Sequence, residues 1–276
     1  MRRCLLRRLA AGIAIVVAAV SLADVALADV APPSACGPDA LGTARVMAVG
    51  GGIRVGTKSY PDTLALADRE VVLTFDDGPW PATTPAVLDA LARECVKATF
   101  FLIGENAEAR PALARRIVAE GHTVGHHTWS HPILTKIATA DALAEIERGM
   151  AADDRASYGA AAAPRVPFFR FPGFADTPAL LEELARRNVA VFGADLWASD
   201  WRQMTPEAEL DLVMLRLRDA GRGIVLFHDT KRHTAEMMPA FLRALKAAGY
   251  RVVHIVPERI GPERIPAQTI PGRPVY

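Results

Sequence analysis

The sequence predicts an α/β fold in which parallel strands alternate with helices. From residue 71 onward, short runs of β-branched or aromatic residues alternate with longer amphipathic segments, which is the pattern of repeated β/α units. Several amphipathic segments begin with threonine and proline and end near a glycine, as helices commonly do. We therefore expect a closed or nearly closed β/α barrel.

Seven strands and six helices are expected. The strands are predicted at residues 71–75, 98–104, 122–126, 167–171, 190–194, 224–228 and 251–256. The helices are predicted at residues 85–94, 111–120, 140–153, 178–187, 206–220 and 235–248. The predicted caps are Thr84, Thr177 and Thr205, and the predicted stops are Gly121, Gly221 and Gly249.

The strand ends of such a barrel share one rim, so functional side chains should gather there. These are Asp76, Asp77, Arg170 and His228.

The composition indicates one globular domain with no affinity for nucleic acid. The chain has 276 residues, of which 51% are hydrophobic, and can bury one substantial core. It carries 32 basic and 31 acidic residues and a formal net charge of +1, so no field of one sign is available to hold a nucleic-acid backbone.

Residues 1–28 have the pattern of a secretory signal peptide. Four arginines precede an apolar run over residues 9–23, and Ala26-Leu27-Ala28 is a small-residue cleavage pattern. The alternative is an uncleaved anchor, but the run is shorter than the roughly 20 residues that a span requires. We expect cleavage near Ala28 and an exported protein, periplasmic or secreted, with no stable membrane anchor afterwards.

The remaining segments flank the main domain, which is expected at residues 70–257. Residues 29–69 contain a glycine triplet and predict a lead-in with a short hairpin, and residues 258–276 predict an extended, proline-rich tail. After cleavage only Cys36 and Cys95 remain. They are expected to form one disulfide, with an unpaired, buried Cys95 as the alternative.

Two segments predict a catalytic metal site. The run TFDDGP at residues 74–79 places two adjacent carboxylates at the end of an apolar strand. The run HTWSHP at residues 127–132 carries two histidines four residues apart, which share one face if the segment turns helically. One carboxylate and two imidazoles suit a catalytic zinc-type ion, and the second carboxylate can take a proton from water. Metal-assisted hydrolysis is the leading interpretation.

These motifs resemble the polysaccharide deacetylases related to nodulation chitooligosaccharide deacetylase, which form carbohydrate esterase family four. The resemblance extends from about residue 71 to residue 256 and implies an incomplete, distorted β/α barrel of about seven parallel strands. It further implies that Asp76 is the general base and that Asp77, His127 and His131 bind a divalent metal, Zn²⁺ or alternatively Co²⁺. His122 and His126 are expected to pack behind the ligands.

A third motif, RFPG at residues 170–173, extends the resemblance. It implies that Arg170 orients the base and that the backbone N–H of Gly173 donates to the developing oxyanion. Pro172 and Phe174 are expected to contact the substrate.

Two further segments complete the expected site. LFHD at residues 226–229 implies that Leu226 lines the acetate pocket and that His228 protonates the departing amine. The fourth motif matches less well: either Asp195 or Asp200 is expected to brace Arg170 or the rim, and Asp200 is favoured because Trp201 follows it. Trp197 and Trp201 are expected either to form a wall for a sugar ring or to be core residues.

The resemblance implies a metal-dependent hydrolase that removes N-acetyl groups from an amino-sugar polymer or oligosaccharide and releases acetate. The substrate would resemble chitooligosaccharide or peptidoglycan. An O-acetyl esterase or small-amide hydrolase on the same fold is one alternative, and a non-catalytic secreted glycan-binding protein is another. An acetylated glycan is the expected partner, and the sequence leaves the oligomeric state open.

Overall fold

The computed structural model describes residue 37 and residues 39–161, 163–164 and 166–258. The chain divides into two units, Met1–Ser34 and Ala35–Tyr276, and the described residues all belong to the second. The predicted signal peptide, Cys36 and residues 259–276 of the predicted tail lie outside the described residues. Cys95 is disulfide-bonded, and its pairing with Cys36 stays a prediction.

Ten strands form one sheet within the described residues. They are β1 Thr43–Val49, β2 Arg54–Val55, β3 Glu70–Asp76, β4 Thr99–Leu102, β5 Thr123–His126, β6 Phe168–Phe169, β7 Ala190–Phe192, β8 Leu196–Trp197, β9 Gly223–His228 and β10 Arg251–Pro257. All seven predicted strands are confirmed, with small shifts at their ends. The sequence analysis did not predict β1, β2 and β8 as such.

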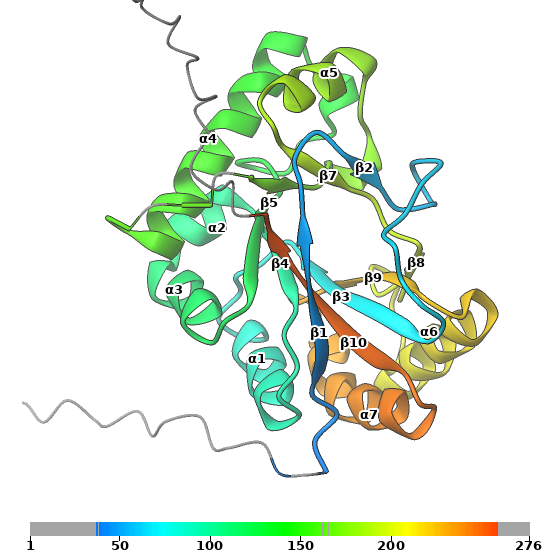
Figure 1. Cartoon of the computed structure of the whole chain (residues 1–276). Helices are drawn as coiled ribbons and strands as arrows, with labels where there is room; N and C mark the ends of the chain where they lie inside the picture. Colours follow the sequence, from blue (N-terminus) through cyan, green and yellow to red (C-terminus); the bar gives the residue numbers. More distant parts are fainter. Residues whose placement is uncertain (1–36, 38, 162, 165, 259–276) are drawn as a thin grey trace, which may run out of the picture. The chain divides into compact units, whose positions relative to one another are not determined.

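Helices surround the sheet (Figure 1). They are α1 Thr84–Arg93, α2 Gly104–Ala109, α3 Pro111–Ala119, α4 Thr139–Tyr158, α5 Pro178–Arg186, α6 Pro206–Ala220 and α7 Arg232–Ala247, with short 3₁₀ helices η1 Leu134–Lys136 and η2 Pro172–Phe174. The six predicted helices are confirmed, and α2 is an addition. No helix in the described ranges is both long and apolar enough to cross a membrane.

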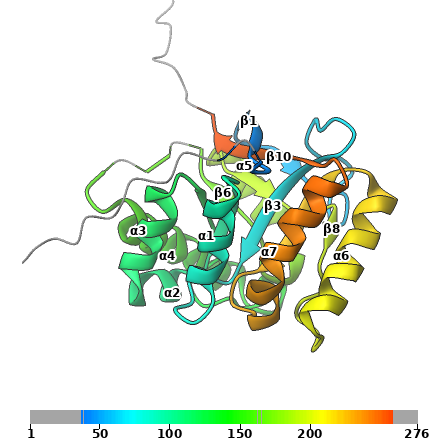
Figure 2. The same ribbon diagram turned by 90° about the horizontal axis from the view of Figure 1, so that it is seen from below.

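The strands form an incomplete β/α barrel, as expected. Their order is β8-β9-β3-β4-β5-β6-β7-β2, and every pairing is parallel. The barrel is not closed, because β8 and β2 are not paired with each other. The pair β1 and β10 joins the start of β3, on the side away from helices α6 and α7 in Figure 2.

The predicted hairpin within residues 29–69 is wrong. β1 pairs in parallel with β10, and β2 pairs in parallel with β7, so the two strands join different parts of the sheet. Gly51 lies in the turn between them, where an added Cβ would lie 2.1 Å from the carbonyl oxygen of Asn188. The glycines thus permit a close crossing over the start of β7 rather than a hairpin turn.

Alternation along β3 separates the core from the site. Leu73 and Phe75 pack outward in the core cluster that includes residues of α1 and α7, where Phe75 stacks on Phe100 and Phe227. Val72 belongs to a second cluster with Phe101 and Phe192. Because side chains alternate along a strand, Thr74 and Asp76 point to the same side as Val72. The side chain of Asp76 therefore points into the barrel interior at the C-terminal end of β3.

Two of the three predicted threonine caps are confirmed. Thr177 Oγ1 accepts a hydrogen bond from Leu180 N–H, and Thr205 Oγ1 accepts one from Ala208 N–H. Thr84 is not a cap, because its hydroxyl accepts from Trp80 N–H and donates to the carboxylate of Asp229. Its side chain therefore ties the start of α1 to the loop after β9.

Glu70 anchors the start of β3. Its side chain is 5% exposed and accepts hydrogen bonds from Arg45 Nε and Nη2 at 2.9 and 2.7 Å, and from Ala67 N–H at 2.9 Å. These contacts join β1, the preceding turn and β3. The hydrogen bond from Arg45 lowers the pKa of Glu70 to about 2, against the opposing effect of burial.

Glu70→Gln should lower the free energy of unfolding by about 1–3 kcal/mol at neutral pH. The carboxylate has a folded pKa of about 2 and an ordinary value of 4.5, so its contribution is complete above 4.5 and is lost as the pH falls toward 2. Urea unfolding should therefore show the difference from wild type shrinking on acidification. Exposed Glu182→Gln is the control, and a difference that does not change with pH would contradict this account.

Candidate active site

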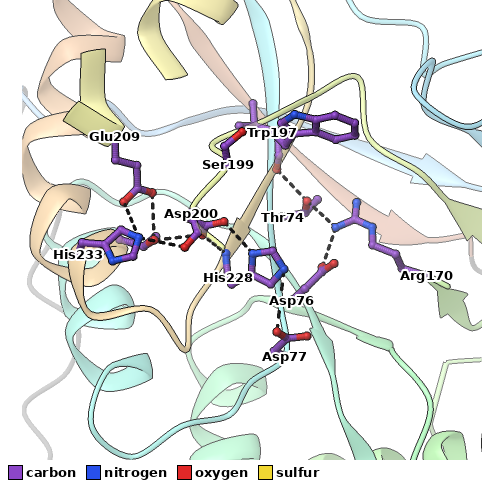
Figure 3. A network of polar contacts seen from close by, with 12 residues as sticks. Thr74, Asp76, Asp77, Arg170, Trp197, Ser199, Asp200, Glu209, His228 and His233 are labelled. Atoms are coloured by element: carbon purple, nitrogen blue, oxygen red, sulfur yellow. Dashed lines mark hydrogen bonds and ion pairs between the residues drawn. The ribbon is translucent and has the colours of Figure 1, made fainter. Parts of the chain in front are cut away.

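Arg170 is the buried centre of the candidate site. It follows β6, its side chain is 0% exposed, and Nη1 donates to Asp76 Oδ1 at 2.7 Å and to Thr74 Oγ1 at 2.9 Å (Figure 3). Nε and Nη2 donate to the carbonyls of Phe192 and Gly193. The guanidinium therefore links β3 to the end of β7 across the barrel, in contact with the carboxylate that was predicted to be the base.

Asp76 is buried and has one free oxygen. Arg170 occupies Oδ1, while Oδ2 has no hydrogen bond among the described residues and lies 3.7 Å from His127 Nε2. Burial raises the pKa of Asp76, and the charge of Arg170 opposes that rise. A carboxylate with a raised pKa and a free oxygen is suited to accept a proton near neutral pH.

Asp77, His127 and His131 come together as a candidate metal-binding group. Each offers one ligand atom, and the three atoms lie within 4.8 Å of one another. Asp77 Oδ1 is 3.7 Å from His127 Nε2 and 3.5 Å from His131 Nε2. Two ligand atoms each about 2.1 Å from a tetrahedral zinc lie about 3.4 Å apart, so these spacings fit one ion.

The electrostatics of this group also suit a metal. Asp77 Oδ1 is buried but has no hydrogen-bond partner in the described part of the chain. His127 Nδ1 lies 2.7 Å from the carbonyl oxygen of Arg170, to which it donates, so Nε2 keeps its lone pair for a ligand. Burial lowers the pKa of His127 to about 3, which keeps the ring neutral. The donor set therefore fits a divalent ion.

The expectation that residues 127–131 turn helically is wrong. The segment is a loop in which Thr128 and His131 have φ values of 68° and 62°, and Thr128 Oγ1 accepts a hydrogen bond from His131 N–H. Helix α4 supports this loop closely, because a Cβ at Gly149 would lie 2.4 Å from the carbonyl carbon of Thr128. The two rings converge, with centroids 4.9 Å apart, because of the loop rather than a helical face.

His228, at the end of β9, lies beside this group and is held by Asp200. His228 Nδ1 lies 2.7 Å from Asp200 Oδ1, and His228 N–H donates to Asp200 Oδ2 at 2.6 Å. The ring therefore turns Nε2 toward Asp77, whose Oδ2 lies 3.9 Å away. Burial lowers the pKa of His228, but the hydrogen bond and charge of Asp200, with the charges of Asp77 and Asp76, outweigh it and raise the pKa to about 9.

Asp195 and Asp200 have different neighbours. Asp200 contacts His228 rather than Arg170, so it braces the rim and not the arginine. Asp195 accepts hydrogen bonds from Thr57, Thr63 and the backbone N–H of Ile224. Asp195 thus joins the loop after β2 to the start of β9 and closes part of the gap in the barrel.

An aromatic row borders His228. Phe174 stacks on Trp197 with ring centroids 6.1 Å apart, Trp197 meets the edge of Trp201 at 5.7 Å, and Trp201 meets His228 at 6.1 Å. Trp201 is 49% exposed. Phe174 and Trp197 are half-buried. A partly exposed aromatic row beside the site is a surface on which a sugar ring can stack.

The other predicted residues lie nearby but differ in exposure. Gly173, within η2, is exposed and has a φ of 58°, and a Cβ there would lie 3.0 Å from the Ile133 side chain. Pro172 and Leu226 are buried. Leu226, in β9, is in register with Thr74 on β3 and with Trp197 on β8.

His122 and His126 are not part of the candidate metal-binding group. His126 Nδ1 lies 3.0 Å from Asp153 Oδ2, and His122 Nδ1 accepts from Ala98 N–H. Both histidines are buried packing residues, as expected.

The sequence analysis missed several residues around the site. Asn106 Nδ2 donates to the carbonyl of Asp77, and Thr234 and Glu209 lie behind Asp200. Glu209 was detectable in principle, because it lies four and eight residues before Val213 and Leu217 on the buried face of α6.

The fold and the site together define a β/α-barrel protein with a candidate metal centre at the strand ends. The family model described as polysaccharide deacetylase matches residues 64–191. The chain is 38% identical over 159 residues to a chitooligosaccharide deacetylase of Sinorhizobium fredii, covering 58% of this chain and 71% of that protein. The chain belongs to the polysaccharide deacetylase family, carbohydrate esterase family four.

Other relatives share this domain within longer proteins. The chain is 34% identical over 192 residues to the peptidoglycan-N-acetylglucosamine deacetylase PgdA of Listeria monocytogenes, covering 69% of this chain and 39% of that protein. A solved structure of a Bdellovibrio bacteriovorus peptidoglycan deacetylase aligns with a TM-score of 0.68 and 33% identity, over 78% of this chain and 58% of that one. The chain thus spans less than two thirds of both proteins.

Arg170→Met should destabilise the fold by about 3–5 kcal/mol, because it leaves the buried Asp76 without its charged partner. Denaturant unfolding measures the loss. Arg187→Met is the control: Arg187 is 39% exposed and its ion pairs with Glu147 and Glu183 lie at the surface, so its removal should cost less than about 1 kcal/mol. Equal losses in the two variants would contradict the central role of Arg170.

Proposed function

We propose that this protein is a metal-dependent hydrolase that removes N-acetyl groups from an amino-sugar polymer or oligosaccharide and releases acetate. One observation carries the proposal. A proton acceptor, Asp76, and a proton donor, His228, each lie within 4 Å of the candidate metal-binding group of Asp77, His127 and His131. Metal-assisted amide hydrolysis needs these three components next to one another.

Asp77, His127 and His131 would hold the metal. A divalent ion bound by three protein ligands supplies Lewis acidity and a water of lowered pKa. Zinc fits two imidazoles and one carboxylate, and cobalt accepts similar ligands. The neutral His127 ring and the unpartnered Asp77 oxygen support this assignment.

Asp76 would act as the general base through Oδ2. Oδ1 is committed to Arg170, so Oδ2 is the oxygen that can take a proton as water adds to the acetyl carbon. Arg170 also fixes the direction of the carboxylate. The raised pKa of Asp76 brings its basicity closer to neutral pH.

His228 would act as the general acid through Nε2. Asp200 occupies Nδ1, which leaves the Nε2 proton directed toward the site. With a pKa raised to about 9, the ring carries that proton at neutral pH. As the carbon–nitrogen bond breaks, the amine nitrogen takes the proton from Nε2, and acetate departs with the oxygen supplied by water.

The substrate assignment rests on the family and on the rim. Relatives are named peptidoglycan and chitooligosaccharide deacetylases, which act on N-acetylated glycans. The row of Phe174, Trp197 and Trp201 would support the sugar, Pro172 and Leu226 would line the acetyl pocket, and Gly173 N–H would donate to the developing oxyanion. Export to the periplasm or exterior, as residues 1–28 suggest, would bring the enzyme to such glycans.

The direct test is mass spectrometry of glycans after incubation with the protein. N-acetylated chitooligosaccharides or peptidoglycan should lose the mass of one acetyl group per event, with matching acetate. Chelation should abolish the reaction, and zinc or cobalt should restore it. His131→Ala should lower the affinity for the metal by at least about tenfold in calorimetry, because one of three ligands is removed.

Half-buried His233 lies outside the candidate metal-binding group, so His233→Ala should bind metal normally. Full activity in verified metal-free protein would contradict the metal assignment. Acetate release from acetylated xylan alone would favour an O-acetyl esterase, and glycan binding with no acetate release after zinc or cobalt is added would favour a non-catalytic binding protein.

Separate tests distinguish base from acid. Asp76→Asn and His228→Ala should each lower turnover on an N-acetyl sugar by about 10²-fold or more, because each removes a positioned proton-transfer group. An activated aryl acetate has a leaving group that needs little protonation. It should therefore rescue His228→Ala far more than Asp76→Asn.

Metal content serves as the control for both variants, since neither residue is an assigned ligand. It should stay near that of the wild type. Equal losses on amide and activated ester would show that the roles are wrongly assigned.

A further inference from the structure

A line of polar side chains continues behind His228 into the interior (Figure 3). Asp200 lies between His228 and Thr234, and Thr234 lies between Asp200 and Glu209. Thr234 Oγ1 is 3.0 Å from Asp200 Oδ2 and 2.9 Å from Glu209 Oε1. Thr234, Asp200 and Glu209 are all buried and come from α7, the loop after β8, and α6.

The protons in this line can be counted. A threonine hydroxyl has one proton to donate, and two ionised carboxylates can only accept. If both carboxyl groups were ionised, one of the two contacts of Thr234 would place lone pairs of two oxygens about 3 Å apart with no proton between them. One of the two carboxyl groups must therefore supply a proton.

Geometry indicates which group supplies it. Asp200 already accepts from His228 at both oxygens, from the ring at Oδ1 and from the backbone N–H at Oδ2. Glu209 is fully buried, and its Oε2 has no hydrogen-bond partner among the described residues. A buried carboxylate with an unpartnered oxygen is costly, and the neutral acid costs much less.

We propose that Glu209 is a protonated carboxylic acid that positions His228 through Thr234 and Asp200. Glu209 Oε1–H donates to Thr234 Oγ1, and the Thr234 hydroxyl donates to Asp200 Oδ2. Asp200 Oδ1 is then left to hold the Nδ1 proton of His228. Glu209 is a positioning residue that touches no substrate, and the proposal rests on the proposed role of His228 as the acid.

The surroundings of Glu209 agree with a neutral acid. Burial and the charge of Asp200 together raise the pKa of Glu209 to about 8, against the opposing effects of the contact with Thr234 and the charge of His228. The other polar group that faces it is His233, whose Nε2 lies 3.7 Å from Glu209 Oε2 and donates to the carbonyl of Asp200 instead. No lysine or arginine pairs with Glu209 in the described part of the chain.

The first test is infrared difference spectroscopy at neutral pH. The wild type minus Glu209→Gln should show the C=O stretching band of one protonated carboxylic acid. Subtraction is required because burial also raises the pKa of Asp153 well above its ordinary value. Asp211→Asn, exposed on the same helix, is the matched control and should show no such band. Absence of the band from the Glu209 difference would overturn the proposal.

The second test is kinetic. Thr234→Val removes the hydroxyl at nearly constant shape and should lower kcat on an N-acetyl sugar by about tenfold, with KM and metal content unchanged. Glu209→Leu should behave similarly. The conservative variants Thr234→Ser and Glu209→Gln keep a hydroxyl and an N–H donor in place, so they should recover most of the lost activity.

The leaving group separates positioning from general damage to the fold. If the line acts through His228, the losses in Thr234→Val and Glu209→Leu should be much smaller on an activated aryl acetate. Equal losses on both substrates, or no rescue by the conservative variants, would overturn the proposal. If the wild type released no acetate from any glycan, the proposed function would fail while the infrared result would still report the proton on Glu209.

Discussion

The burial of one guanidinium group constrains most of this structure. A charge removed from water must be hydrogen-bonded on all sides, and Arg170 meets that demand with acceptors on β3 and at the end of β7. Its ring neighbour Phe101 covers it, with Cζ 4.2 Å from the ring centroid. The backbone carbonyl of Arg170 accepts a hydrogen bond from His127 Nδ1. Arg170 therefore sets the direction of Asp76 and the tautomer of His127, while it holds two sides of the barrel together.

The hydrogen bonds of the rim carboxylates distinguish their uses. Buried polar atoms in folded proteins are nearly always paired, so an unpaired buried oxygen requires an explanation. Asp77 has such an oxygen, and Asp76 has one free oxygen beside it. Asp200 has none, since His228 and Thr234 occupy both of its oxygens. The donors around these carboxylates thus leave an oxygen free on Asp76 and Asp77 and none on Asp200.

The open edge of the barrel shapes the surface beside His228. β2 and β8 end the sheet without pairing to each other, and Asp195 links the loop after β2 to β9 through side-chain hydrogen bonds. Because the edge is joined by a loop and not by a further strand, the segment from Trp197 to Trp201 can turn outward beside His228. Trp197, Trp201 and the carboxylate that holds His228 are consequently placed by the same short connection. This explains why Asp195 and Asp200 have different contacts although only four residues lie between them.

The sequence by itself determined the alternation of strands and helices, the site motifs and their common rim, because periodicity, proline and glycine signals and strand direction act between near neighbours. It could not determine that β1 and β2 do not pair with each other, since their partners β10 and β7 lie far along the chain. It could not distinguish the contacts of Asp195 from those of Asp200. Nor could it show that residues 127–131 form a loop that packs closely against Gly149. Nor did it distinguish Glu209 from an exposed helical glutamate. Only the tertiary structure decided these points, because pairing, burial and the number of available donors depend on residues that meet after folding.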